Sequence, residues 1–588
     1  MSQNIFADMR IRVLQALHAA VPDLSADIAA RVEVTPTREA AHGDMATNAA
    51  LVASKAARSK PADLAAKLVA ALAGDPMVAE ASAAGPGFVN MRLHPAVWRS
   101  RLPDILREGV HFGVGTVGKG VRVNVEYVSA NPTGPMHIGH CRGAVVGDAL
   151  ANLMAKAGFS VTKEFYCNDA GNQVIAFAWA AYWRYLQALG TNMTQESFAA
   201  QTPTGLQYSG DYLLPVGQAL AETHGPALAG PGLTVADPVL WLATVRETAL
   251  AMMNASIRED LTAMGVRFDI FSSEQAMIAS GAVDATIERL RAAGLIYEGT
   301  LEPPKGKQLD DWEPRVQTLF RATKFGDDVD RPLRKSDGSN TYFANDIAYH
   351  ADKLKRGANL LIDVLGADHG GYVSRMTAAI KALGGRLEVV LCQIVHVLKN
   401  GEPIKMSKRA GSYVALRDLI DEVGGDAVRF TMLMRKSDAQ MEFDIAQAVT
   451  QSSENPVFYV QYAHARCRSV LRSADEMFGA GIDLAGVPLG SLSSEAELLV
   501  MRRLMAWPRT VEAAALAREP HRIAFFLYDL AADFNMLWDQ GRRDAALRFL
   551  LPDRREDSLA RVALVAAVAT VLRSGMAVMG VTPVEEMR

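Results

Sequence analysis

Hydrophobic positions recur with a helical period in the first part of the chain. Ile11, Leu14 and Leu17 are spaced by three residues, and residues 46–72 continue with a similar spacing. Pro61 stands where a second helix of that stretch would begin, a position at which a missing backbone N–H costs nothing. The pattern therefore predicts a helix around Leu14 and further helices within residues 46–72.

The period changes to two after a turn that is rich in glycine and proline. Gly85-Pro86-Gly87 precedes residues 88–93, in which side chains alternate as in a strand with one buried face. A glycine-spaced link over residues 113–120 follows. Residues 1–112 are therefore expected to form a small α+β domain.

The middle of the chain combines strand signals with a helical run. The strand-like segment 121–128 passes through a loop of glycine and proline into a helical run over 138–157. Such a junction places a nucleotide at the carboxyl edge of a doubly wound parallel sheet. Further strand signals occur at 359–364 and 387–395. The fold class that this pattern predicts is α/β, with a doubly wound, Rossmann-like catalytic domain.

The limits of that domain follow from where the strand signals stop. We expect it to cover residues 113–455, with a partly helical insertion around 175–340. After Pro456 helical periodicity continues to the end of the chain, which predicts an all-α domain over 456–588. This region contains arginine but no lysine. Arginine suits phosphates and base edges, although solvated helix faces explain the same composition.

Composition excludes several classes of protein. The chain has 588 residues, 49% hydrophobic and 21% charged, and a net charge of −4, so it is neither disordered nor polycationic. Its four cysteines are widely spaced, which argues against a disulfide scaffold and a cysteine-rich zinc site. No signal peptide is evident, and the apolar run 562–572 is shorter than the ~18–20 residues of a membrane span. We therefore expect a cytoplasmic protein that has no membrane partner.

Two histidines stand at the start of the helical run that follows the first strand of this domain. His137 and His140 are three residues apart and face the same way at a helix N-terminus, where backbone amides favour phosphate. Imidazoles at this place can donate to phosphate oxygens as charge develops in a transition state. Gly139 between them lets a ligand approach the backbone. Taken alone, the motif is also explained by two surface histidines near a helix cap.

A second motif, Lys405-Met406-Ser407-Lys408, lies on a loop flanked by Gly401 and Gly411. Two lysines on a movable loop suit a clamp on a polyphosphate. A basic surface loop is the simpler explanation when the motif is taken alone. The two motifs occur together in one predicted sheet domain, and no Walker A loop is present. Their combination favours a nucleotide-dependent enzyme.

With its surroundings, this pair of motifs resembles the class I aminoacyl-tRNA synthetases, and in particular arginyl-tRNA synthetases of the bacterial type. The resemblance extends over essentially the whole chain. The segments that carry it, besides the two motifs, are 43–48, 85–90, 125–135, 335–338, 341–342, 346–350 and 455–466. It implies a ligase that activates L-arginine with ATP, accompanied by Mg²⁺ as a substrate ion, and transfers it to the 3′ end of tRNA(Arg).

The resemblance also implies the residues that bind ATP. His137 and His140 would stabilise charge on the phosphates, and Lys405 and Lys408 would hold the α- and β-phosphates as pyrophosphate leaves. These four are the expected catalytic residues. The expected ATP-binding residues are His137, Gly139, His140, Asp368, His369, Lys405, Met406, Ser407 and Lys408. Asp368 and His369 are included because they follow the strand that ends at Val364. The second motif ends in Arg409 where serine is commoner.

Four further positions match residues that hold the amino acid: Glu126, Asn131, Tyr342 and Asp346. Carboxylates and a ring suit a planar guanidinium, which pairs with Glu126 and Asp346 fork to fork. Asn131 would bind the α-amino or carboxylate end of the substrate. A helix-cap role for Asp346 and a structural ion pair for Glu126 are the open alternatives. The contact that Tyr372 makes stays open, because Gly370-Gly371 before it depart from the family pattern.

The resemblance assigns roles to the outer domains as well. Residues 1–112 would bind the body of the tRNA, and residues 456–588 would bind its anticodon. We expect a monomer with no fixed metal site in the protein. Another class I synthetase and a non-catalytic RNA-binding paralogue are the alternative functions, and the intact motif residues His137, His140, Lys405 and Lys408 argue against the second.

Overall fold

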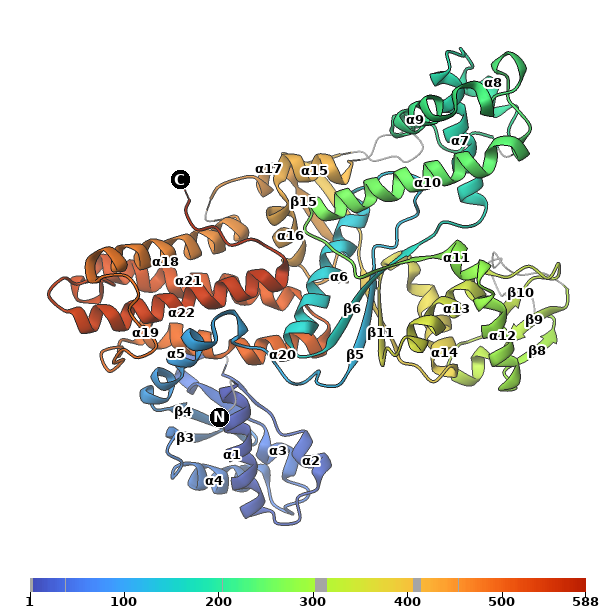
Figure 1. Cartoon of the computed structure of the whole chain (residues 1–588). Helices are drawn as coiled ribbons and strands as arrows, with labels where there is room; N and C mark the ends of the chain where they lie inside the picture. Colours follow the sequence, from blue (N-terminus) through green and yellow to red (C-terminus); the bar gives the residue numbers. More distant parts are fainter. Residues whose placement is uncertain are drawn as a thin grey trace. The chain divides into compact units, whose positions relative to one another are not determined.

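The computed structural model forms two compact units, which are described separately (Figure 1). It describes residues 4–37, 39–203, 205–301, 315–404, 414–452 and 454–587. The first unit joins the two ends of the chain and comprises residues 1–117, 156–158 and 451–588. The second comprises residues 118–155 and 159–450.

The N-terminal part of the first unit packs helices on an antiparallel sheet of strand order β1-β2-β4-β3. The predicted helices form, and Pro61 occupies the first turn of α4 as expected. The buried face of α1 differs from the prediction, because Met9, Val13 and Leu17 point inward whereas Ile11 is 54% exposed. The bounds are α1 (Ile5–Ala20), α3 (Ala49–Ala53), α4 (Pro61–Leu72), β1 (Val34–Pro36), β2 (Met45–Thr47), β3 (Val78–Ala84), β4 (Phe88–Leu93) and α5 (Pro95–Glu108).

The C-terminal part of the first unit is a bundle of helices, and its described residues contain no strand, as predicted. The bounds are α18 (Pro456–Phe478), α19 (Glu495–Met505), α20 (Trp507–Ala517), α21 (His521–Arg543) and α22 (Arg555–Met579). By length and composition α22 could cross a membrane. It is longer than the apolar run 562–572, but 78% of its most apolar window is buried, and it packs against α5, α18 and α21. This is the position of a core helix in a bundle.

The second unit is built on a five-stranded parallel sheet of order β12-β11-β5-β6-β7. β5, β6 and β11 lie side by side at its centre (Figure 1). The expected doubly wound α/β fold is confirmed. The bounds of the elements that position the site are β5 (Arg122–Tyr127), α6 (Ile138–Lys156), β6 (Ser160–Cys167), β7 (Ile270–Ser273), α13 (Tyr342–Lys355), β11 (Leu360–Gly366), α14 (Val373–Ala382) and β12 (Leu387–Cys392).

The region expected as one insertion contains a strand of the central sheet. β7 pairs with β6 in parallel and divides the region into two parts. The first part is helical, with α7 (Asn172–Ala188), α9 (Leu214–His224) and α10 (Pro238–Ala263). The second contains α11 (Glu274–Ala279), α12 (Ala282–Ala292), β8 (Ile296–Gly299), β9 (Gln317–Phe320) and β10 (Arg331–Arg334). Pattern reading missed β7 because it is only four residues long and half-buried throughout.

The strand expected over 387–395 is in fact the whole of β12, which ends at Cys392, and the first residue of another strand. The chain leaves the central sheet after Cys392, where the Gln393 N–H donates to the Ser437 carbonyl at 2.8 Å. β13 (Val395–Lys399) then joins a separate sheet with β14 (Glu402–Pro403) and β15 (Met441–Asp444). The helices α15 (Leu416–Val423), α16 (Gly425–Leu433) and α17 (Ile445–Ala448) complete this region.

Two glycines of α6 allow a matched test of this packing. A Cβ at Gly147 would lie 2.3 Å from the buried ring of Tyr127, whereas a Cβ at Gly143 would meet nothing within 4 Å. Gly147→Ala should therefore overpack the core and cost about 1–3 kcal/mol of unfolding free energy. Gly143→Ala should be neutral or stabilising by up to about 1 kcal/mol, because alanine is the better helix former. Urea unfolding measures both, and equal midpoints for the two variants would contradict the packing argument.

Candidate active site

The two histidines of the first motif lie at the start of α6, beyond the carboxyl end of β5. Their ring centroids are 4.1 Å apart. The backbone N–H of Gly139 donates to Nδ1 of His137 at 3.1 Å, and that of His137 donates to Nδ1 of His140 at 3.3 Å. Because each Nδ1 accepts a hydrogen bond, the hydrogen of each neutral ring lies on Nε2. Both imidazoles are thus donors at Nε2, as a phosphate site requires.

The chain that follows the second motif is anchored to this segment. Ile138 N–H donates to the Val414 carbonyl at 3.3 Å, and Leu416 N–H donates to the Met136 carbonyl at 2.9 Å. His137 and Ala415 form the antiparallel bridge between these two hydrogen bonds. Val414, three positions after Gly411, therefore lies beside the first motif. Lys405, Met406, Ser407 and Lys408 themselves lie outside the described residues.

Asp368 and His369 lie at the carboxyl end of the central sheet, as predicted. They belong to the short helix Ala367–Tyr372 that directly follows β11. Both side chains are exposed, and the His369 Nε2 atom is 3.7 Å from Asp368 Oδ2. The described structure therefore brings Asp368, His369 and the two motif histidines to the same edge of the sheet.

Tyr342 and Asp346 occupy successive turns at the start of α13. Thr341 is the N-cap of this helix, and its side chain accepts a hydrogen bond from the Ala344 N–H. The alternative in which Asp346 caps the helix is therefore wrong. The Tyr342 side chain is 63% exposed, so its ring is accessible to a ligand.

Asp346 is a carboxylate in an unfavourable electrostatic environment. Burial, followed by the nearby carboxylates of Glu126 and Glu274, raises the pKa of Asp346 to about 6. The hydroxyl of Tyr372 donates to Asp346 Oδ2, and this bond and the charge of nearby His350 oppose part of the rise. This hydrogen bond is a contact of Tyr372, which the sequence had left open.

Glu274 is a site residue that sequence reasoning missed. It is 3% exposed at the start of α11, and its Oε1 accepts from Asn345 Nδ2 at 3.0 Å. Burial raises the pKa of Glu274, and the carboxylate of Asp169 adds to the rise. The only signal for this residue was its place directly after β7, which was not recognised as a strand of the sheet.

The hydroxyl of Tyr166 lies close to several of these carboxylates. Burial raises the pKa of Tyr166, and the carboxylates of Glu274, Asp346, Glu126 and Asp169 raise it further. The phenol therefore stays neutral. These side chains form one acidic cluster although they come from β5, β6, α11 and α13 and from the loop after β6. A cluster of this kind is suited to a cation.

A strained turn directly follows β5 and leads to Asn131. Val128 and Ser129 have φ values of 67° and 41°, which are uncommon for residues other than glycine. Ser129 Oγ donates to Glu126 Oε1 at 2.8 Å and accepts from the Tyr166 N–H at 3.1 Å. Asn131 is exposed, and its Nδ2 donates to Gln173 Oε1 at 3.0 Å. The turn thus holds one oxygen of Glu126 in place.

A row of three carboxylates crosses the centre of the sheet below this cluster. Glu126 on β5 is in register with Asp363 on β11 and with Glu164 on β6. All three are buried. Unpaired carboxylates at such positions would each cost several kcal/mol, so the row requires cations.

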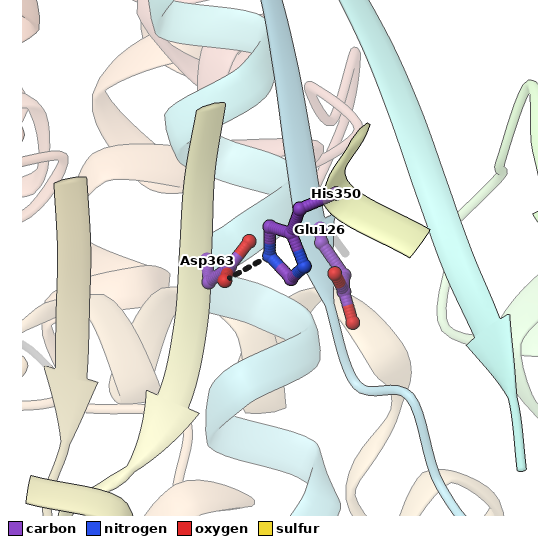
Figure 2. Close-up of side chains that lie close together, drawn as sticks. All are labelled: Glu126, His350 and Asp363. Carbon is purple, nitrogen blue, oxygen red and sulfur yellow. Dashed lines mark hydrogen bonds and ion pairs between the residues drawn. The ribbon is translucent and has the colours of Figure 1, made fainter. Parts of the chain in front are cut away.

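Helix α13 and its C-cap residue Arg356 supply three cations at a spacing of three residues. Lys353 Nζ is 2.5 Å from Glu126 Oε2 and 3.5 Å from Asp363 Oδ1, and Arg356 Nη2 donates to both oxygens of Glu164 at 2.8 Å. The third cation is His350, which lies between Asp363 and Glu126 in Figure 2. The open alternative for Glu126, a structural ion pair, is thus present in the structure. An additional contact with a ligand is compatible with it.

The hydrogen bonds of His350 determine its charge. Nδ1 lies 2.7 Å from the Asp346 carbonyl oxygen, which can only accept, and Nε2 lies 2.8 Å from Asp363 Oδ2. Burial alone would lower the pKa of His350, but Asp363 outweighs it and the pKa is raised. The pKa of Asp363 is lowered to about 2, because Lys353 and His350 overcome the effect of burial. The row is therefore balanced, with three anions and three cations.

The same atoms have the spacing of a metal site. Ligand atoms of Glu126, His350 and Asp363 lie within 4.8 Å of one another. However, Lys353 Nζ already contacts both carboxylates, and both ring nitrogens of His350 face acceptors. A metal ion would have to displace the ammonium group and a proton, so the donor set does not fit one.

Comparisons with known proteins agree on one family. The model of the arginyl tRNA synthetase N terminal domain matches residues 8–93, that of the class I (R) tRNA synthetase catalytic domain 101–193, and that of the DALR anticodon binding domain 460–587. The chain is 61% identical to the arginine–tRNA ligase of Gluconobacter oxydans, over 99% of this chain and 98% of that protein. It is 54% identical to that of Xanthobacter autotrophicus, with 100% of both chains covered.

Solved structures show the same fold. A putative arginyl-tRNA synthetase from Campylobacter jejuni is 30% identical, with a TM-score of 0.70 over 84% of this chain and 100% of that one. The arginyl-tRNA synthetase of Thermus thermophilus is 21% identical, with a TM-score of 0.73 over 98% of this chain and 100% of that one.

His350→Gln should change how stability depends on pH. The folded state holds a proton that the unfolded state loses above about pH 6.5, because the pKa of His350 is raised. This stabilisation is complete below about pH 6.5 and is lost as the pH rises through the folded pKa. Urea midpoints between pH 6 and pH 9 should therefore fall less steeply in the variant than in the wild type.

The control is His464→Gln in α18. That histidine is also buried, but burial lowers its pKa. The folded state therefore loses stability through His464 as the pH falls below about 6.5, which is the opposite sign. Parallel curves for the wild type and His350→Gln above pH 6.5 would contradict a charged His350.

Proposed function

We propose how the described residues carry out the reaction of the arginine–tRNA ligases, the family to which this chain belongs. The enzyme activates L-arginine with ATP and charges tRNA with it. The first step forms arginyl-adenylate by attack of the arginine carboxylate on the α-phosphorus of ATP, and pyrophosphate leaves. The second transfers the arginyl group to a ribose hydroxyl at the 3′ end of tRNA(Arg).

Asp346 and Glu274 are assigned to the guanidinium of arginine. The observation that carries this assignment is that each carboxylate of the row has a cation, whereas no salt bridge to a described residue is found for Asp346 or Glu274. Burial raises the pKa of both groups, and neighbouring carboxylates add to the rise. A planar cation with five N–H donors supplies the missing charge and pairs with carboxylates in a bidentate manner. Tyr342 adds an exposed ring beside this position.

Asn131 is assigned, as expected, to the other end of the substrate. Glu126, expected to pair with the guanidinium, is assigned to that end too, because Lys353 already supplies its cation. Lys353 and Ser129 each bond one oxygen of Glu126, and lone pairs remain on both oxygens for a substrate N–H. Asn131 follows on the strained turn that leads from β5 to the two histidines of the first motif. An arginine extended along this path would place its carboxylate toward the ATP site.

The ATP site is assigned to the start of α6 and the carboxyl end of β11. His137 and His140 would donate from Nε2 to phosphate oxygens, and Gly139 would let the nucleotide approach the backbone. Asp368 and His369 are assigned to the adenosine. Lys405, Met406, Ser407 and Lys408 would close over the phosphates, which the anchoring of Val414 beside Ile138 supports. Mg²⁺ accompanies ATP as a substrate ion.

The outer parts of the chain are assigned to tRNA. We propose three domains, 1–112 for the tRNA body, 113–455 for catalysis and 456–588 for the anticodon. The match of residues 460–587 to an anticodon binding domain supports the last assignment. So does an Arg466 guanidinium 4.1 Å from the ring centroid of half-exposed Tyr462, because such a pair can stack a base. The enzyme is proposed to act as a monomer in the cytoplasm, without a membrane.

Asp346→Asn should raise the Kd of arginine by ten-fold or more and leave that of an ATP analogue nearly unchanged. The variant keeps the size of the side chain but removes its charge, and losing one partner of a buried charge pair costs about 2–5 kcal/mol. Discrimination against the uncharged analogue citrulline should weaken. Isothermal titration with tRNA present measures both ligands. The control Asp352→Asn lies on the same helix in an exposed pair with Arg356; equal arginine affinities in the two variants would argue against the assignment.

The affinity of the wild type for arginine should also fall below about pH 6. The pKa of Asp346 is about 6 in the free protein, so at lower pH a proton must be removed before the guanidinium can pair with this carboxylate. The Asp346→Asn variant should lack this dependence.

Lys408→Ala should slow adenylate formation while arginine binding stays nearly intact. Removing one contact to charge that develops in the transition state costs about 3–4 kcal/mol, or roughly 10²–10³ in rate. Pre-steady-state measurement of adenylate formation tests this role. A rate within a few-fold of the wild type would exclude it.

A further inference from the structure

Lys353 carries a buried ammonium group that contacts Glu126, a residue assigned to arginine. Its side chain has 0% exposure, and its Nζ contacts Glu126 Oε2 at 2.5 Å and Asp363 Oδ1 at 3.5 Å. The same atom lies 4.3 Å from the centroid of the Tyr349 ring. A strongly hydrated ammonium is costly to bury, and these contacts compensate for that cost.

The position of Lys353 is itself held from two sides. Asp363 contacts Lys353 through Oδ1 and His350 through Oδ2, and Figure 2 shows the contact with His350. His350 in turn donates from Nδ1 to the main-chain carbonyl of Asp346, one turn earlier on α13. A continuous chain of polar contacts therefore runs from the backbone of one proposed arginine ligand to the carboxylate of another.

We propose that Lys353 is a positioning residue for arginine binding, which acts through Glu126. By bonding one oxygen, Lys353 holds the Glu126 carboxylate in one orientation. By matching its charge, Lys353 leaves Asp346 and Glu274 as the carboxylates that take the guanidinium. This inference rests on the assignment of Glu126 to the arginine pocket under the proposed function.

A purely structural role for Lys353 predicts something different. Arg356 and Glu164 form a comparable pair in the same row, one turn further along the helix. Glu164 is not among the groups assigned to arginine. If the row served only to hold α13 on the sheet, breaking either pair would lower stability and affect both substrates in the same way.

A double-mutant cycle on the full-length enzyme separates the two roles. The KM of arginine, the KM of ATP and kcat are measured in aminoacylation for Lys353→Met, Glu126→Gln and the double variant. Each single variant should raise the KM of arginine about ten-fold or more and that of ATP less than about three-fold. The double variant should be no worse than the worse single variant, because one interaction is lost only once.

The control Arg356→Met should lower the thermal midpoint while the KM of arginine stays within about three-fold of the wild type. If Lys353→Met alone does not fold, the double variant still decides, since it replaces both charges with neutral groups of similar size. Its KM for arginine should then equal that of Glu126→Gln.

Three results would overturn the proposal. The first is a double variant in which the fold increase in the KM of arginine equals the product of the fold increases in the two single variants. The second is a Lys353→Met enzyme in which the KM of ATP and kcat change in parallel with the KM of arginine. Where Lys353→Met does not fold, the same parallel change between Glu126→Gln and the double variant counts as this result. The third is an unchanged KM of arginine in Glu126→Gln, which would also remove Glu126 from the proposed pocket. In the first two cases the pocket assignment stands, and only the role of Lys353 is lost.

Discussion

The structure of the catalytic unit depends on the pairing of three buried carboxylates with three cations. The carboxylates stand side by side on β11, β5 and β6 because the strands are parallel and in register. His350, Lys353 and Arg356 lie above them because residues three apart share one face of a helix. Neither row could be buried without the other. This constraint allows α13 only one register on the sheet.

That register in turn places the residues that we assign to substrates. Tyr342 and Asp346 belong to the same helix, about two turns and one turn before His350, so they are carried to the carboxyl edge of the sheet. Within this unit, Asp346 and Glu274 form no salt bridge with a described residue, whereas each carboxylate of the row has a cation. The difference explains why one part of a continuous polar region acts as support and the adjacent part can take a cationic substrate.

The connection from β5 to α6 performs a second task at that edge. Its first residues adopt strained conformations that let Ser129 hold Glu126, and its last residues form the helix start that presents His137 and His140. One short segment thus joins the proposed amino-acid site to the proposed phosphate site. Strain at such a place is consistent with a site whose geometry is set before substrates bind.

The sequence by itself determined the fold class and the place of the two histidines at a helix start, because these depend on spacing within short segments. It also predicted, as a proposal that stays open, that Asp346 binds a cationic substrate. Only the tertiary structure decided that Glu274 lies near Asp346 and that Lys353 pairs with Glu126. Lys353 and Glu126 are 227 residues apart, and their meeting follows from strand register and helix packing. Local periodicity carries no information about such a pairing, because the chain between the two residues does not constrain it.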